Sequence, residues 1–181
     1  MRIALINTKF PHNVGAVLRA ASCYGAQEVC FSGSRVVSHI METKRIPREE
    51  RMRGYRDVKL AFSPDPLTYF RGAGTPVAVE LRDNSECLFE FEHPEDAVYV
   101  FGPEDGSLGR EVLTRCHRFL TIPTRHCTNL GAAVYTVLYD RAFKEWIKNG
   151  SKPPLLDIDP VSEDDHASIV VQQLQELLRK K

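Results

Sequence analysis

The stretch from residue 101 to residue 141 reads FGPEDGSLGREVLTRCHRFLTIPTRHCTNLGAAVYTVLYDR, and it holds both strand ends and helix starts. An apolar run over residues 98–101 stops at Gly102 and Pro103, and a second run over 119–122 stops at Pro123. Short apolar runs bounded by Gly and Pro are typical of buried strands. Ligands of open α/β sheets bind in loops at the carboxyl ends of such strands. This stretch therefore predicts a buried sheet with a ligand site at its edge.

Strand and helix patterns alternate through the rest of the chain. Strands are expected over residues 2–7, 28–31, 76–80, 98–101 and 119–122. Helices are expected over residues 13–24, 65–70, 109–116 and 129–148. This alternation predicts an α/β fold with a mostly parallel sheet flanked by helices. The helix over 129–148 is apolar over so wide an arc that one side is expected to pack on the sheet and another on a partner subunit.

The C-terminal part differs in composition from the domain expected over residues 1–149. Residues 150–160 hold three prolines and are expected to form a linker. A helix is expected over 161–181, with Val170, Leu174, Leu177 and Leu178 on one face and a basic end at 179–181. Two roles stay open for this helix: packing on the core or on a second subunit, or contact of the basic end with RNA.

Composition sets the limits of the functional argument. With 181 residues, 43% of them hydrophobic, the chain can bury one full core. The 24 basic and 24 acidic residues cancel at a pI of about 7.0, so net charge gives no argument for a nucleic-acid partner. No apolar stretch of membrane-spanning length is present, and Arg2, Asn7 and Lys9 interrupt any signal-peptide pattern. A cytoplasmic protein is expected.

The cysteines and the missing motifs exclude several kinds of site. The five cysteines lack a CxxC pair and histidines at zinc spacing, which predicts reduced structural thiols and no metal site. Cys127 next to His126 leaves open an activated nucleophile, although adjacent side chains seldom face each other. The chain also lacks GxxxxGK[ST] and a GxGxxG after its first strand, which disfavours nucleoside triphosphate and dinucleotide cofactors.

Three motifs occur in a fixed order. The first, in IALINTKFPHNVGAVLRAA, contains Asn13, Gly15 and Arg19. The second is FGPE at 101–104, and the third is Ile-Pro at 122–123 followed by Cys-Thr-Asn at 127–129. Over about residues 1–145 the chain resembles the SpoU/TrmH-type branch of the SPOUT RNA methyltransferases. It departs from that family in the third motif, where the loop from Ile122 to Cys127 is shorter and Cys127 stands in place of a serine.

The resemblance implies a single-domain α/β-knot, with a deep trefoil knot, that acts as a homodimer on RNA. It also implies S-adenosylmethionine as cofactor and a ribose 2′-hydroxyl as acceptor. The implied cofactor residues are Leu81, Gly102, Ile122, Cys127, Asn129 and Leu130. Among these, Gly102 is favoured by its own chemistry, because glycine at a strand end lets a ligand lie directly against backbone groups.

The catalytic residues implied by the resemblance are Arg19, Asn13, Glu104 and Asn129. Arg19 would reach the cofactor of the opposite subunit, and because arginine stays protonated, electrostatic stabilisation and phosphate anchoring are expected rather than base catalysis. Asn13 and Asn129 both stand where helix N-caps are expected, with substrate contact as the alternative. Glu104 is expected to pair with Arg19 or to accept hydrogen bonds from loop amides.

A basic segment suggests where RNA would bind. Six cations occur within thirteen residues, against Glu49 and Glu50 and with Tyr55 interleaved: Lys44, Arg45, Arg48, Arg51, Arg53 and Arg56. This pattern predicts phosphate contacts with one stacking side chain, and a solvated charged face is the alternative. A chain of this size without a large appended RNA-binding domain favours tRNA over rRNA. The competing hypotheses are a noncatalytic RNA-binding or assembly protein and a base methyltransferase, although Arg19 in the first motif favours ribose.

Overall fold

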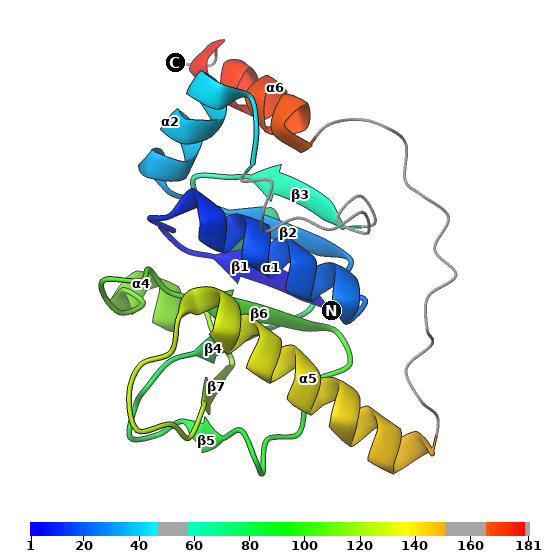
Figure 1. The fold of residues 1–181 in the computed structure, drawn as a ribbon. Coiled ribbons are helices and arrows are strands. Elements are labelled where there is room, and N and C mark those ends of the chain that lie inside the picture. The colour runs from blue at the N-terminus through cyan, green and yellow to red at the C-terminus, as the bar shows by residue number, and fades with distance from the viewer. Residues whose placement is uncertain (47–57, 151–165, 180–181) are drawn as a thin grey trace.

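A computed structural model describes residues 1–46, 58–150 and 166–179 (Figure 1). The strands are β1 (Arg2–Leu5), β2 (Glu28–Phe31), β3 (Lys59–Phe62), β4 (Thr75–Val79), β5 (Glu86–Cys87), β6 (Ala97–Phe101) and β7 (Arg118–Thr121). The helices are α1 (Pro11–Cys23), α2 (Ser34–Thr43), α3 (Pro66–Tyr69), α4 (Arg110–Leu113), α5 (Leu130–Asn149) and α6 (His166–Arg179).

One sheet organises the described residues, in the strand order β3-β2-β1-β6-β4-β7-β5. Every pairing between its neighbouring strands is parallel. The predicted α/β class with a mostly parallel sheet is therefore confirmed. The trefoil knot stays a prediction.

Helices cover both faces of the sheet, and because successive side chains of a strand point to opposite sides, one strand can contribute to two cores. In β1, Ile3 and Leu5 join a large core with α1, α2, α5 and α6, and Ala4 points to a smaller core with α3 and α4. Figure 1 shows α1 and α5 lying side by side over one face of the sheet. Small residues on the opposite face, Ala4 and Cys30 among them, leave room for short helices to approach closely.

Most expected elements are present, with shifted ends. β2 has the predicted bounds, whereas α4 is shorter than the expected helix over 109–116. The strands β3 and β5 and the helix α2 were not predicted. β5 has only two residues, which is too short for a strand pattern, and α2 begins after Gly33 without the side-chain cap that usually marks a helix start.

The prediction that Asn13 caps a helix was wrong. α1 begins two residues earlier, at Pro11, and Phe10 takes the N-cap position without a side-chain hydrogen bond. Proline suits the first turn of a helix, because its fixed φ fits there and no intrahelical partner is needed for its nitrogen. Asn13 is consequently inside the first turn and only 2% exposed.

The C-terminal helix packs on the core, as one of its two expected roles requires. Val170 and Leu174 of α6 are buried against β3 and α2, and Gln173 Oε1 accepts a hydrogen bond of 2.8 Å from the Phe62 amide. α6 thereby covers the edge strand β3, which otherwise exposes unpaired backbone groups. The expected linker lies almost wholly outside the described residues, so the domain limits stay predictions.

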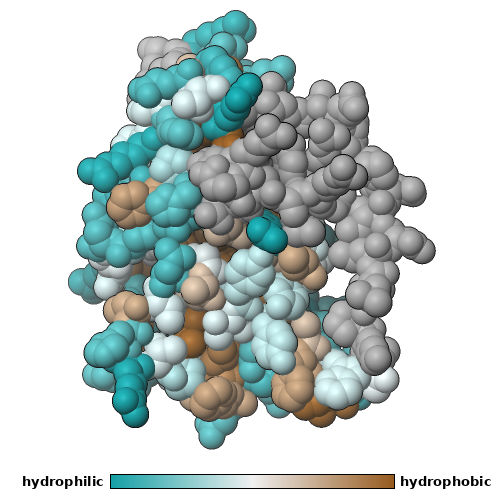
Figure 2. All heavy atoms as spheres, viewed as in Figure 1, coloured by the Kyte–Doolittle hydropathy of each residue, from teal (hydrophilic) through white to brown (hydrophobic). Residues whose placement is uncertain are grey.

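One side of α5 has no covering element in the described part of the chain. Its apolar side chains there are Tyr139, Phe143, Trp146 and Ile147, which are 43–63% exposed. The Tyr139 and Phe143 rings stack with centroids 6.3 Å apart. In Figure 2, hydrophilic surface gathers over α2, whereas apolar surface is concentrated in the half of the molecule that holds α5. No helix within the described ranges is both long enough and apolar enough to cross a bilayer.

Candidate functional site

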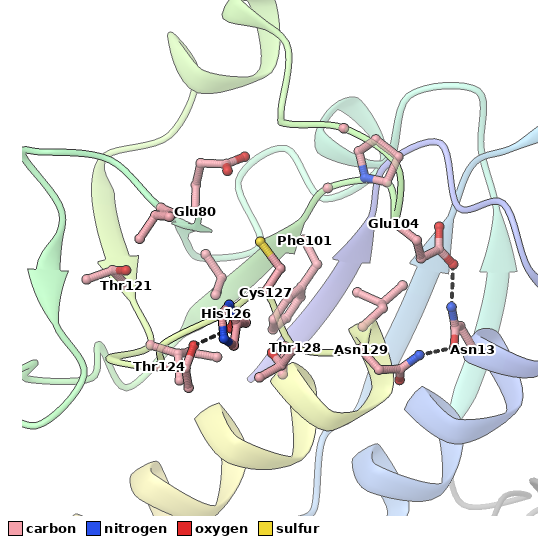
Figure 3. A pocket seen from close by; sticks show the side chains of 18 of the residues that line it. Asn13, Glu80, Phe101, Glu104, Thr121, Thr124, His126, Cys127, Thr128 and Asn129 are labelled. Atoms are coloured by element: carbon pink, nitrogen blue, oxygen red, sulfur yellow. Dashed lines mark hydrogen bonds between the residues drawn. The ribbon is translucent and has the colours of Figure 1, made fainter.

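A cavity of about 890 Å³ opens at the carboxyl ends of β4, β6 and β7, beside the first turns of α1 and α5 (Figure 3). Its walls combine apolar side chains with polar groups from separate chain segments. The lining residues include Phe10, His12, Asn13, Glu80, Leu81, Phe101, Gly102, Glu104, Thr121, Ile122, Arg125, Cys127, Asn129 and Leu130. The expected position of a ligand site in an open α/β sheet is thus the position of the cavity.

Three polar residues from the three sequence motifs are joined in one relay of hydrogen bonds (Figure 3). Asn129 Oδ1 accepts from the Gly131 and Ala132 amides at 2.8 and 3.4 Å and so caps α5. Asn129 Nδ2 is then left to donate to Asn13 Oδ1 at 3.1 Å. Asn13 Nδ2 in turn donates to Glu104 Oε1 at 2.5 Å. The helix cap therefore fixes the orientation of both amide side chains.

Glu104 ends this relay and holds the start of α1. Its Oε2 accepts from the Lys9 amide at 2.9 Å, and its Oε1 lies 3.4 Å from the Phe10 amide. Of the two roles expected for Glu104, the structure has the contact with loop amides and not a pair with Arg19. The carboxylate thus fixes the chain that leads into α1, whose N-cap residue makes no side-chain hydrogen bond of its own.

The loop after β6 is fixed by a second carboxylate. Glu80, directly after β4, accepts a hydrogen bond of 2.7 Å from the Leu108 amide. A Cβ added at Gly102 would lie 3.3 Å from both the amide nitrogen and Cγ of Leu108. The missing side chain at Gly102 therefore makes room for Leu108, and the residue presents its backbone to the cavity. From the sequence, Gly102 was expected to make room only for a ligand.

The six residues expected at the cofactor all line this cavity. Leu81 is 75% exposed at the rim, whereas Leu130 is only 7% exposed. Cys127 is exposed, and its sulfur projects toward the cavity in Figure 3. His126 is tied to the loop through its backbone, because its carbonyl accepts from Thr124 Oγ1 at 2.8 Å.

Arg19 does not line the cavity, and neither do Lys44 and Arg45, the two described cations of the basic segment. Arg19 is exposed on α1, six residues beyond Asn13, which is about 9 Å further along a helix axis. Lys44 ends α2 in a left-handed conformation with φ 54°, and it is exposed, as is Arg45. Arg48, Arg51, Arg53 and Arg56 lie outside the described residues, so the role of the segment stays a prediction.

Sequence reasoning missed several lining residues, notably Phe10, His12, Glu80 and Arg125. Only Phe10 had a signal in the sequence, because it precedes Pro11 at a position where a polar helix cap is usual. No group of three or more His, Cys, Asp or Glu side chains suited to a metal ion occurs in the ranges that the structure describes. The cavity thus joins apolar walls, backbone groups and an ordered amide relay.

Comparison with known protein families identifies the family of this chain. Residues 1–139 match the model of the SpoU rRNA Methylase family, which covers most of the chain. The chain belongs to the SpoU rRNA Methylase family. No curated protein matches it in sequence.

Solved structures show the same fold. The SpoU methyltransferase AviRb from Streptomyces viridochromogenes, in complex with the cofactor AdoMet, has a TM-score of 0.65 at 19% identity over 80% of this chain and 57% of its own. The TrmH/SpoU tRNA modifying enzyme of A. aeolicus has a TM-score of 0.68 at 18% identity over 97% and 88%. A structure concerned with 2-OH methylation of C/U34 on tRNA has a TM-score of 0.60 at 24% identity over 81% and 90%.

These likenesses establish the fold alone. The chain spans little more than half the length of AviRb.

Proposed function

We propose that this protein is an S-adenosylmethionine-dependent RNA methyltransferase that modifies a ribose 2′-hydroxyl. The observation that carries the proposal is the relay from Asn129 through Asn13 to Glu104, which joins all three motifs at one cavity. Membership in the SpoU family supports methyl transfer to RNA. One related structure is a complex with AdoMet, which supports S-adenosylmethionine as the cofactor. Another concerns 2-OH methylation of C/U34 on tRNA, which supports a ribose hydroxyl as the acceptor.

The cavity fits the cofactor in size and in the character of its walls. Its volume of about 890 Å³ lies within the roughly 300–1,000 Å³ usual for small-molecule sites. Apolar side chains of Phe101, Ile122 and Leu130 can enclose an adenine, and the backbone beside Gly102 offers donors and acceptors. When bound, S-adenosylmethionine supplies an activated methyl group on its sulfonium. The chain's main task is then to place the ribose in line with that group.

Arg19 would act at the cavity of a second copy of the chain. It is exposed on α1 and does not line the cavity of its own subunit within the described residues. Its guanidinium can stabilise negative charge that develops on the ribose oxygen and can anchor a phosphate. The exposed aromatic side of α5, with Phe143 and Trp146, is the surface that we propose packs in the homodimer.

Mixed dimers test the shared site. Arg19→Ala should abolish methyl transfer and leave cofactor affinity nearly unchanged, and Gly102→Val should lose cofactor affinity by displacing the loop at Leu108. A dimer of one subunit of each kind has one site with an intact Arg19 and an intact cavity. Recovery of activity on mixing is expected, and its absence where subunits demonstrably exchange would contradict the shared site.

tRNA is the substrate that we propose, bound through the basic segment at residues 44–56. Because phosphate contacts release counterions, the salt dependence of affinity reports their number. Replacing Arg48, Arg51 and Arg53 by alanine should make the slope of log affinity against log salt concentration less steep by about two to three units. An unchanged slope would move the RNA surface elsewhere, for example to the end of α6.

The acceptor can be identified in cells. Ribose methylation is mapped in total RNA from cells that lack the protein, and again after return of the wild-type gene or of Arg19→Ala. One 2′-O-methylated nucleotide should disappear, return with the wild type and stay absent with the variant. An unaltered ribose map would refute the proposed reaction.

A further inference from the structure

An exposed aromatic pair stands at the rim of the cavity, immediately before the buried relay. Phe10 is 42% exposed, and its ring stacks on the exposed imidazole of His12 with centroids 5.6 Å apart and planes 26° apart. Both residues line the cavity. Neither of the two buried apolar clusters in the described part of the chain includes Phe10.

Helix formation does not account for this phenylalanine. It takes the N-cap position of α1, where Ser, Thr, Asp or Asn would contribute a side-chain acceptor, and it makes no such bond. A large apolar ring that is 42% exposed and belongs to neither buried cluster contributes little to the core. The ring is therefore available for a contact that forms only when something enters the cavity.

The backbone under the ring is held in place. The Phe10 carbonyl accepts from the Asn13 amide at 3.0 Å, and the preceding amide of Lys9 donates to Glu104 at 2.9 Å. The ring is thus carried by the residues that hold the relay. A planar group resting on Phe10 would remain beside Asn13 and Glu104.

We propose that Phe10, backed by His12, is the stacking platform for the base of the nucleotide that is methylated. The inference rests on the proposed function and names how its substrate is held. Enzymes that modify nucleotides commonly turn the target out of its stack, and an aromatic side chain then replaces the lost stacking partner. Arg125, which is exposed and lines the same cavity, supplies a cation for the adjoining phosphate.

Stacking has a consequence for specificity. Every base has a π-face, so an aromatic platform holds purines and pyrimidines without reading their edges. Phe10 should therefore determine how tightly the acceptor nucleotide is held and not which base it carries. Loss of the ring should weaken the hold on all RNAs that the protein accepts by a similar factor.

The test compares Phe10→Leu, which keeps an apolar side chain but removes the ring, with Phe10→Tyr, which keeps the ring. The matched control is Phe89→Leu, because Phe89 is 74% exposed and does not line the cavity. Methyl transfer is followed at saturating S-adenosylmethionine against the concentration of total RNA from cells lacking the protein. Cofactor affinity is measured by calorimetry and subunit association by sedimentation.

Phe10→Leu should raise the RNA concentration for half-maximal transfer by about 5- to 150-fold, which corresponds to about 1–3 kcal/mol of stacking per base. Phe10→Tyr and Phe89→Leu should stay near wild type, and cofactor affinity and sedimentation should not change. Equal behaviour of Phe10→Leu and wild type would overturn the platform. A loss shared by Phe10→Tyr, or a change in sedimentation, would instead assign Phe10 to packing or to the contact with a second copy of the chain.

A binding readout separates this inference from the proposed reaction. A short single-stranded RNA with one 2-aminopurine reports a change of stacking partner by a change in its fluorescence, without chemistry. A fluorescence change with the wild type and with Phe10→Tyr, but not with Phe10→Leu, would support the platform even if no methyl transfer occurred. A fluorescence change that does not depend on the ring would overturn the platform even if methyl transfer were normal.

Discussion

Asn13→Asp tests the hydrogen-bond relay most sharply, because it changes one atom of a buried side chain. The Asn13 side chain accepts from Asn129 Nδ2 at 3.1 Å and donates to Glu104 Oε1 at 2.5 Å, and the residue is 2% exposed. The substitution keeps the shape and the acceptor for Asn129. It removes the donor for Glu104 and places a second carboxylate against it.

The expected loss follows from these two changes. A hydrogen bond to a charged group contributes about 1.5–3 kcal/mol. Two unit charges about 3 Å apart repel by roughly 5 kcal/mol at an effective dielectric constant of about 20, and movement of the carboxylates relieves most of this. We expect a loss of about 3 kcal/mol at pH 8. A proton on the introduced carboxyl at acidic pH restores the donor, so the loss should shrink to about 1 kcal/mol or less near pH 4.

The assay is urea unfolding of the wild type and Asn13→Asp at both pH values, each compared at the same pH. Asn129→Asp is the matched control, since it retains the acceptor that caps α5 and loses only a donor to a neutral oxygen. That control should lose about 0.5–1.5 kcal/mol. A loss below about 1 kcal/mol for Asn13→Asp at pH 8, or the same loss at both pH values, would refute the relay.

Three further perturbations test packing, electrostatics and the cavity. Gly131→Ala would bring a new Cβ within 2.9 Å of a side chain on α1, so thermal unfolding should show a loss of about 1–3 kcal/mol despite the better helix propensity of alanine; a gain would contradict the close packing of α1 on α5. Burial by itself raises the pKa of Asp65, but hydrogen bonds from Arg115 and from α3 hold it at about 2. The cost of Asp65→Asn, about 1 kcal/mol or less for so exposed a pair, should be present at pH 6 and fade in urea titrations as pH falls from about 4 to 2; a pH-independent cost would sink this assignment. S-adenosylmethionine should slow iodoacetamide alkylation of Cys127 and not of Cys23, as followed by peptide mass spectrometry; equal rates for Cys127 with and without it would place the cofactor elsewhere.

The sequence predicted the sheet better than it predicted the contacts of the site. Strand ends were readable because Gly102, Pro103 and Pro123 interrupt apolar runs beside them. The position of Asn13 was misjudged because Pro11 starts the helix earlier and Glu104, 91 residues away, holds that start. Such contacts depend on how distant segments meet, which local pattern does not encode.

The same distinction holds for the residues that line the cavity. Asn129 was predicted as a helix cap, and it is one, because capping is set by the residues next to it. Its second bond, to Asn13 across 116 positions, could not be foreseen. Glu80 and Phe10 were missed for the same reason, since only the folded chain brings them to the cavity.

The most direct measurement of the central claim is methyl transfer in vitro with identification of the product. Purified protein is incubated with S-adenosylmethionine labelled in its methyl group and RNA from cells that lack the protein. The RNA is then hydrolysed by alkali, which leaves a 2′-O-methylated linkage intact as a dinucleotide. The proposed reaction predicts label in one alkali-stable dinucleotide and none with Arg19→Ala. Label in an alkali-released base-methylated mononucleotide, or no label in RNA under conditions where the cofactor binds, would contradict it.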